Sequence, residues 1–254
     1  MKTTTLLLLA ASLLPSCVWA WNTPGEDFSG ELSLRGTVTR MRNPWVWRIG
    51  EGDNGLHVQR VTLTRNGEAV IPVPLRAMTL LLGKTMHTTP LGCEGLSPRV
   101  TYGQGQDGFQ LAWTAPGTAT ITLPVKGADN IRIGSFTFQM LAAAVIRYAE
   151  QGRTLYAGLY EDRNGNGVPP QAALMPQEQI AGKLQAMFAG DGPDWLAAIH
   201  ISGSAGLSRF NDAQLHQIAG VYGAQVIPGS GELRFHGAVP SHWRVSLPVS
   251  VEYQ

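Results

Sequence analysis

Apolar and polar residues alternate near both ends of this chain, and a period of two is typical of a β-strand with one buried and one solvated face. Near the N-terminus the alternation runs through residues 27–39, DFSGELSLRGTVT. Near the C-terminus it runs through WRVSLPVSVEYQ, in which one face carries Trp243, Val245, Leu247, Val249, Val251 and Tyr253. An apolar strand that runs to a chain end needs a cover, so the two ends predict a mainly β fold with a sheet edge to protect.

Further strand-like runs lie between the two ends and are separated by turn sequences such as RNGE and APGT. They cover residues 46–50, 57–65, 68–76, 77–83, 109–114, 119–126 and 131–146. Their spacing favours an antiparallel sandwich over alternating strand–helix units. Proline at position 248 cannot donate a ladder hydrogen bond, so it marks the C-terminal run as an edge strand or a broken one.

The middle of the chain has a helical period instead. One helical face carries four apolar residues, namely Ile180, Leu184, Met187 and Phe188. This stripe predicts a helix over residues 176–190. Asn211, followed three residues later by Gln214, resembles a helix start and predicts a second helix over residues 211–224. We therefore expect a small helical insertion at about residues 170–223 inside a single β domain.

Residues 1–20 have the features of a secretion signal, with one charge at Lys2, a short apolar core and a small-residue cleavage pattern ending at Ala20. The apolar core is too short to span a bilayer. Lipid attachment at Cys17 is the alternative, but the proline two residues before this cysteine disfavours it. The mature chain is therefore expected to begin at Trp21.

Cleavage of this signal removes Lys2 from the 19 Lys and Arg residues, which leaves 18 basic residues against 18 acidic ones. A balanced surface argues against nucleic acid as a partner. Cleavage also removes one of the two cysteines, so Cys93 has no partner for an internal disulfide. A buried, inert thiol is the expected state of Cys93.

Several motifs suggest chemistry, but each has a simpler interpretation. DRNGNG places Asp162, Asn164 and Asn166 at alternate positions, as in the start of a calcium loop. The twelfth position is Ala173 instead of a bidentate glutamate, so a plain Asn-Gly turn is favoured and a cation there is only a weak candidate. The histidines show no zinc spacing and accompany no nucleophile motif, so we expect neither catalysis nor a cofactor.

Several blocks of the sequence, in order, resemble a known family. They are Trp21 at the expected mature N-terminus, the segment at residues 27–39, the W-x-W pair of Trp45 and Trp47 followed by RIG, LLLGKT at 80–85, TTP at 88–90, LPVKGADNIRIGS at 123–135, and AVPSHWRVSLPVSVEY at the C-terminus. Together they resemble the minor pilin subunits of the FaeG/FaeI/FaeH-like chaperone–usher fimbriae. The parity of the two tryptophans favours core positions over a sugar-stacking surface.

The resemblance implies an incomplete immunoglobulin-like β-sandwich that lacks its final strand, a small helical insertion and an N-terminal donor-strand arm. In this arrangement residues 1–20 are the signal peptide, 21–39 the donor-strand extension and 40–254 the pilin domain. The implied donor residues are Phe28, Gly30, Leu32, Leu34, Gly36 and Val38, with Gly30 at a shallow position. The implied recipient groove, which the chaperone also faces, lies along Val245, Leu247, Val249, Val251 and Tyr253.

The same resemblance implies a non-enzymatic subunit of a surface fimbria that passes through the periplasm. Its implied partners are other fimbrial subunits, a periplasmic chaperone, an outer-membrane usher and, through the assembled fibre, host glycans; nucleic acid is not among them. Two alternatives remain open at this point. One is a glycan-binding adhesin on the same fold, and the other is an unrelated secreted β-sandwich such as a hydrolase or a calcium-binding module.

Overall fold

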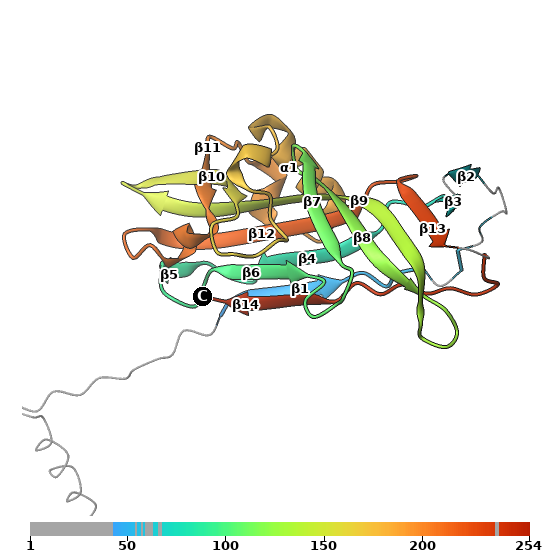
Figure 1. Ribbon diagram of the computed structural model, residues 1–254. Helices are drawn as coiled ribbons and strands as arrows, with labels where there is room; N and C mark the ends of the chain where they lie inside the picture. The colour runs from blue at the N-terminus through green and yellow to red at the C-terminus, as the bar shows by residue number, and fades with distance from the viewer. Residues whose placement is uncertain (1–42, 54, 57, 59–62, 66–67, 237–238) are drawn as a thin grey trace, which may run out of the picture. The chain divides into compact units, whose positions relative to one another are not determined.

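The computed structural model describes residues 43–53, 55–56, 58, 63–65, 68–236 and 239–254 (Figure 1). The expected signal peptide and the N-terminal arm, here defined as residues 21–39, lie outside the described residues, and so do all six expected donor residues. Within the described residues, no helix is both long and apolar enough to cross a membrane.

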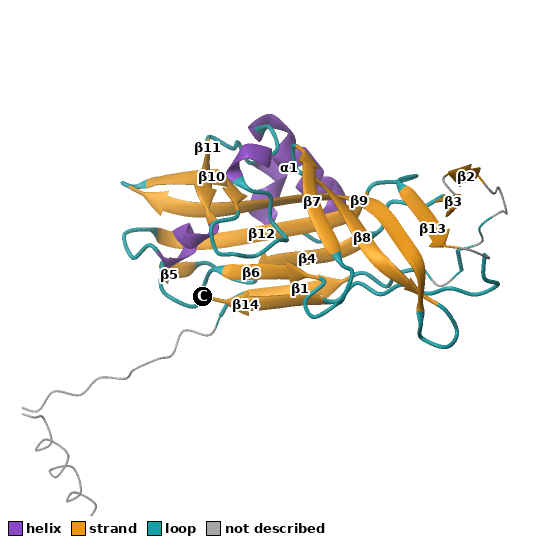
Figure 2. Ribbon diagram, in the orientation of Figure 1, coloured by secondary structure: helices purple, strands orange, loops and turns teal. Residues whose placement is uncertain are grey.

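The described part of the chain is mainly β, as the sequence predicts, and carries one α-helix (Figure 2). The strands are β1 (Trp45–Ile49), β2 (Leu63–Arg65), β3 (Glu68–Val73), β4 (Thr79–Thr85), β5 (Thr89–Leu91), β6 (Pro98–Tyr102), β7 (Gln110–Ala115), β8 (Thr118–Lys126), β9 (Arg132–Glu150), β10 (Arg153–Tyr160), β11 (Gly203–Gly206), β12 (His216–Val226), β13 (Gly231–His236) and β14 (Val249–Tyr253). The helix is α1 (Gln177–Phe188), and three 3₁₀ turns surround it: η1 (Gln171–Ala173), η2 (Asp194–Ala198) and η3 (Leu207–Asn211).

The strands form one large sheet and one small sheet. The large sheet has the order β1-β4-β12-β9-β13-β3-β2, and the long strand β9 also pairs with β8 and β10, which continue to β7 and β11. All of these pairings are antiparallel except that of β10 with β11. The small sheet contains β6 and β14 in antiparallel register, from Val249 opposite Tyr102 to Tyr253 opposite Pro98.

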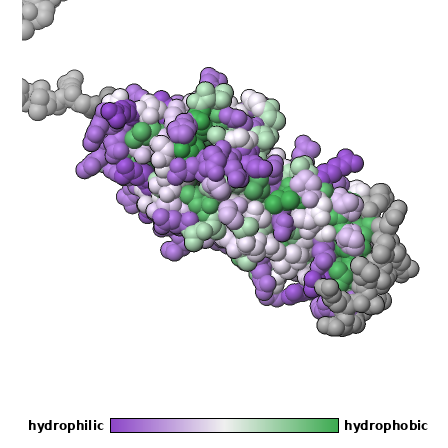
Figure 3. Space-filling view, turned by 90° about the horizontal axis from the view of Figure 1, so that it is seen from above, coloured by the Kyte–Doolittle hydropathy of each residue, from purple (hydrophilic) through white to green (hydrophobic). Residues whose placement is uncertain are grey.

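Two apolar clusters lie on the large sheet. The main cluster lies between the large sheet and the β6–β14 sheet and includes Val100, Tyr102, Ile121, Ile146 and Tyr222. The second forms where α1 covers the sheet through its predicted stripe, which contacts Leu82, Val145 and Val221. Figure 3 shows the molecule from the side on which α1 lies, where polar and apolar side chains are interspersed. This layered arrangement is sandwich-like.

The first predicted helix is confirmed as α1, but the second is wrong. Residues 216–226 form β12 in the interior of the large sheet, between β4 and β9. Both faces of β12 are buried, because Tyr222 belongs to the main cluster and Val221 to the cluster under α1. A strand that is buried on both sides does not alternate, so its apolar residues matched a helical spacing by chance. Asn211 ends η3 and does not begin a helix.

The predicted strand runs are largely confirmed. Strand β3 lies within its expected run, strands β1, β4, β7, β8 and β9 overlap theirs, and β2 contains the described end of the run at residues 57–65. Trp45 is a core residue as predicted, with 7% of its surface exposed, whereas Trp47 is only half-buried. Of the C-terminal run, residues 249–253 form a regular strand, and Arg244 makes an isolated antiparallel bridge to Lys126.

Candidate functional site

The candidate site is the space between the two strands β1 and β14. Among the described residues, strand β1 is an end strand of the large sheet and pairs only with β4, and β14 pairs only with β6. The two strands lie side by side near the C-terminus in Figures 1 and 2. Each has one edge on which the described residues provide no ladder partner. Unpaired strand edges of this kind can accept a further strand.

The C-terminal run covers the core only partly. Five of the six predicted inner positions, Trp243, Val245, Leu247, Val249 and Val251, are half-buried, but Tyr253 is exposed. On the other face residues 244, 246 and 248 are exposed, but Ser250 is half-buried. The neighbouring strand β6 differs, because Val100 and Tyr102 are 0% and 1% exposed. The alternation is thus confirmed for residues 243–249, and the inner face of the run still has apolar surface that another strand could cover.

The opposite border of the space shows the same incomplete cover. Along β1, the residues on the face of Trp45 become steadily more exposed, until Ile49 is 60% exposed. A large cavity of about 490 Å³ lies near the start of the C-terminal run. Apolar residues of β3, β13 and the run, including Ile71, Phe235 and Trp243, line it. We call the space between β1 and β14 the groove, and the end of it that points toward this cavity the cavity end.

One short segment, residues 93–97, holds both borders of the groove at one end, and we call it the clamp. On the β1 side, Asn43 donates through Nδ2 to the Gly95 carbonyl at 2.8 Å, and Trp45 donates through Nε1 to the Leu96 carbonyl at 3.1 Å. On the β14 side, Gly95 N–H donates to the main-chain oxygen of Gln254 at 2.9 Å, and Gln254 N–H donates to the Ser97 carbonyl at 3.0 Å. The start of β1 and the end of β14 therefore meet at the clamp.

The clamp is itself held by η3. Ser97 donates through its hydroxyl to the Leu207 carbonyl at 2.8 Å. The side chain of Asn211 accepts from Ser97 N–H at 3.3 Å and donates to the main-chain oxygen of Gln254 at 2.8 Å. Asn211 thus ties η3 to the clamp and to the chain end at once.

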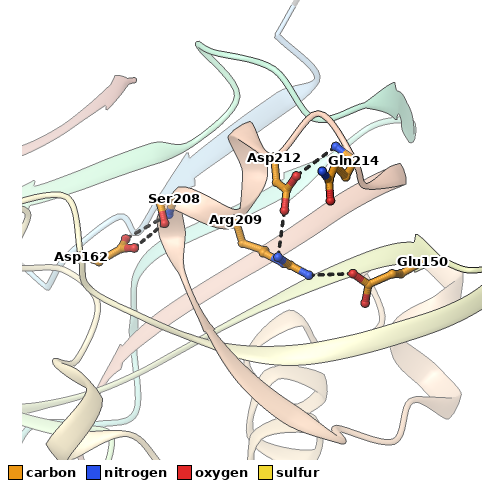
Figure 4. Close-up of polar contacts among 6 residues, drawn as sticks. All are labelled: Glu150, Asp162, Ser208, Arg209, Asp212 and Gln214. Atoms are coloured by element: carbon orange, nitrogen blue, oxygen red, sulfur yellow. Dashed lines mark hydrogen bonds and ion pairs between the residues drawn. The ribbon is translucent and has the colours of Figure 1, made fainter.

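A polar network fixes η3 on the body of the domain (Figure 4). The guanidinium of Arg209 forms ion pairs with Asp212 at 2.8 Å and with Glu150, at the end of β9, at 3.1 Å. The carboxylate of Asp162 points toward Ser208 and accepts a hydrogen bond from its N–H at 3.0 Å. Because these groups anchor both ends of η3, Asn211 holds the chain end from a fixed support.

We expect Asn211→Ala to lower the free energy of unfolding by about 1–3 kcal/mol, because both hydrogen bonds of the amide are lost and one is to the chain end. Chemical denaturation of the full-length chain measures this change. Gln104→Ala is the matched control, since it removes one exposed hydrogen bond from Ser250 and should change stability by less than about 1 kcal/mol. Equal effects of the two variants would contradict the role of Asn211.

Near the clamp, a side-chain hydrogen bond spans the groove. Trp47 donates through Nε1 to the Tyr253 hydroxyl at 2.8 Å, across 206 residues of sequence. Trp47 also stacks on Trp45, with 5.1 Å between ring centroids, and packs over Gly83 on the inner face of the sheet. Burial raises the pKa of the Tyr253 phenol, and the hydrogen bond from Trp47 partly opposes this rise. We call this pair the Trp47–Tyr253 bridge.

The DRNGNG turn packs against the edge of β6 that β14 does not use. The Asn166 side chain accepts from Tyr102 N–H at 2.7 Å and donates to the Tyr102 carbonyl at 3.0 Å, as a paired strand residue would. Asn164 lies in the left-handed region with φ of 59°. Burial raises the pKa of the neighbouring Glu161 carboxyl, and hydrogen bonds from the Arg163 and Gly165 N–H groups oppose this rise.

Two of the three oxygen donors proposed as a weak cation site are bonded to other groups. Asp162 faces Ser208, and Asn166 faces Tyr102. In the part of the chain that the structure describes, no three His, Cys, Asp or Glu side chains lie close enough together to hold a metal ion. The turn supports β6, and through β6 it supports the strand that borders the groove.

The structure places the expected recipient residues along one border, whereas no sequence pattern indicated the other border. Three features were not predicted from the sequence: β1 as the second border, the clamp, and the bonds that Asn211 makes to the clamp and the chain end. The only available signal was the parity of Trp45 and Trp47, which places both on the inner face but does not show that Trp47 is half uncovered. The predicted donor positions lie outside the described residues.

Comparison with known proteins gives consistent matches. The family model described as fimbrial, major and minor subunit (Fimbrial_K88) matches residues 1–254. The K88 minor fimbrial subunit FaeI of Escherichia coli is 57% identical over 254 residues, which is all of both chains. The K88 fimbrial proteins AC and AD of Escherichia coli are 28% and 30% identical, over 57% and 53% of this chain and 54% and 50% of their own lengths.

Proposed function

Because this chain belongs to the family of K88 fimbrial major and minor subunits, we propose that its groove accepts a β-strand from a neighbouring fimbrial subunit. As a member of this family, the chain is a minor-type subunit of a cell-surface fimbrium, and its family is not an enzyme family. The observation that carries the proposal is the pair of open edges on β1 and β14 over half-buried apolar side chains.

The N-terminal arm supplies a suitable donor strand. Its six alternating positions, Phe28 to Val38, match in number the six inner positions of the C-terminal run, Trp243 to Tyr253. Its four large apolar side chains would cover the half-buried inner face, and each such burial contributes about 1.5–3 kcal/mol. Ladder hydrogen bonds to both open edges would satisfy backbone groups that otherwise face water.

The position of the clamp indicates the direction of the donor strand. The arm precedes Asn43, which is bonded to the clamp, so each subunit's arm is attached at the clamp end of its own groove. A donor parallel to β14 would bring the clamp ends of two subunits together, a reciprocal contact that closes into a pair. A donor antiparallel to β14 places the donor subunit at the cavity end instead. That head-to-tail contact repeats and builds a fibre.

An exposed apolar groove needs protection before assembly. We therefore assign the temporary cover of the groove to a periplasmic chaperone, which lends it a strand. We assign the later exchange of this strand for a subunit's arm to an outer-membrane usher. Transit through the periplasm follows from the signal peptide expected at residues 1–20. We assign no catalytic role to the chain. Any contact with host glycans is assigned to the assembled fibre.

Deletion of residues 21–39 behind the signal peptide tests this proposal. The truncated chain should still fold in complex with the chaperone, because its groove is intact, but it should not donate a strand to another subunit. Co-purification with the chaperone and immunoblotting of isolated fimbriae measure the two properties. If the arm belonged to the chain's own sheet, the deletion would unfold the domain, and no chaperone complex would be recovered.

A further inference from the structure

We infer that Arg48, on the outer face of the edge strand β1, recognises the incoming arm through an ion pair with Glu31 of that arm. The inference rests on the proposed donor-strand function and adds a polar contact on the face of the arm that does not enter the core. Its basis is a positively charged pocket that lies directly beside the open edge of β1.

The pocket lies on the outer face of the large sheet, which is the face that α1 covers. Its volume is about 170 Å³. This is smaller than the pockets of about 300–1,000 Å³ that hold small-molecule ligands, so a single side chain is the occupant that fits it. The apolar lining includes Val46, Leu82 and Phe188, and the polar lining consists of Arg48, Lys84 and Asp191.

The polar lining of the pocket carries more positive than negative charge. Arg48 donates through Nη1 to the Asp191 carboxylate at 2.7 Å, and Lys84 donates through Nζ to the main-chain oxygen of Asp191. Two cations therefore share one carboxylate. A guanidinium has five N–H donors, and the contacts among the described residues engage one of those of Arg48. Because the Arg48 side chain is 58% exposed, it can bind a second carboxylate that arrives along the edge.

The arm carries one acidic residue, Glu31, within the span of its apolar positions from Phe28 to Val38. Glu31 alternates with the apolar residues, so it lies on the outer face when they face the core. Strand β1 begins at the clamp and β14 ends there, so a donor antiparallel to β14 runs parallel to β1. The half of the arm that contains Glu31 then lies beside β1. Same-face neighbours in adjacent strands, including diagonal ones about 7–8 Å apart, are within reach of long side chains.

The opposite border of the groove does not attract Glu31. The charged outer residue of β14 is Glu252, which has the same sign as Glu31 and is paired with Arg99. The charges therefore favour contact of Glu31 with the β1 border. Any strand with alternating apolar residues could fill the core side of the groove, whereas a charge pair on the outer side distinguishes one arm from another.

Charge reversal on both sides tests the pair. The recipient is the full-length chain carrying Leu32→Asp, whose own arm is not expected to donate, and the probe is a fluorescent peptide of residues 26–39. We expect the Glu31→Arg peptide to bind about tenfold more weakly than the unchanged peptide, because repulsion from Arg48 replaces attraction. Adding Arg48→Glu to the recipient should restore the affinity of the Glu31→Arg peptide to within about threefold of the original value. Arg48 is more than half exposed, so this variant should fold.

Two further charge changes are the controls. The Thr37→Arg peptide adds a positive charge at another outer position, and its affinity should not improve in the Arg48→Glu recipient. Arg153→Glu reverses an exposed charge at the start of β10, outside the groove, and should not rescue the Glu31→Arg peptide. Fluorescence polarisation gives each dissociation constant.

Equal affinities of the Glu31→Arg and unchanged peptides for the recipient that retains Arg48 would overturn the pair while leaving the donor-strand function intact. Equal rescue by Arg153→Glu and Arg48→Glu would do the same. The first comparison requires no substitution at Arg48, so it holds even if that variant does not fold. If the unchanged peptide does not bind the recipient, the proposed function fails together with the pair.

Discussion

A subunit carrying Leu32→Asp is expected to be absent from fimbriae while remaining soluble in complex with its chaperone. Leu32 lies in the middle of the apolar face of the arm, so the proposal buries its side chain in a neighbour's groove. The substitution removes about 2 kcal/mol of apolar burial and adds the cost of desolvating a carboxylate, which is several kcal/mol. The affinity of the arm for a groove should therefore fall by about 10³-fold or more.

Immunoblotting of purified fimbriae and of the chaperone complex measures this effect. Ser33→Asp is the matched control, because it introduces the same charge one residue away on the opposite, solvated face of the arm. Normal incorporation of Leu32→Asp, or equal exclusion of both variants, would show that the arm does not use its apolar face as a donor.

The second large effect is expected on the receiving side. Val249→Asp places a carboxylate on the half-buried inner face of β14, opposite Tyr102 and within the apolar surroundings that the donor strand should cover. Such a subunit should lose its affinity for the arm peptide by about 10³-fold, while its own arm remains able to donate. Fluorescence polarisation with the peptide of residues 26–39 measures the loss.

The two variants complement each other. Leu32→Asp can receive but not donate, and Val249→Asp can donate but not receive, so a mixture should form one-to-one pairs that do not grow. Sedimentation velocity distinguishes these pairs from monomers and from longer assemblies. Ser246→Asp is the control for the groove variant, because residue 246 is exposed on the other face of the run. A Val249→Asp subunit that binds the peptide normally would show that this face does not receive a strand.

The sequence by itself determined the elements that depend on neighbouring residues. Alternation of apolar residues predicted the strand at the C-terminal end of the described body, and the stripe at Ile180 and Leu184 predicted α1, because one face of each of these elements is polar. The same reasoning failed at residues 216–226. There, both faces are buried between other elements, and partners distant in the sequence decided the structure.

The groove could be predicted only on one side. The C-terminal run carries its half of the pattern in its own residues, from Val245 to Tyr253. The other half depends on contacts between residues that are far apart in the chain, such as the Trp47–Tyr253 bridge across 206 residues and the bonds from Asn43 and Asn211 to the clamp and the chain end. A single polar residue in a sequence does not reveal its hydrogen-bond partner. Local periodicity therefore determined which strands have an apolar face, and only the tertiary structure decided which two strands leave their edges open beside each other.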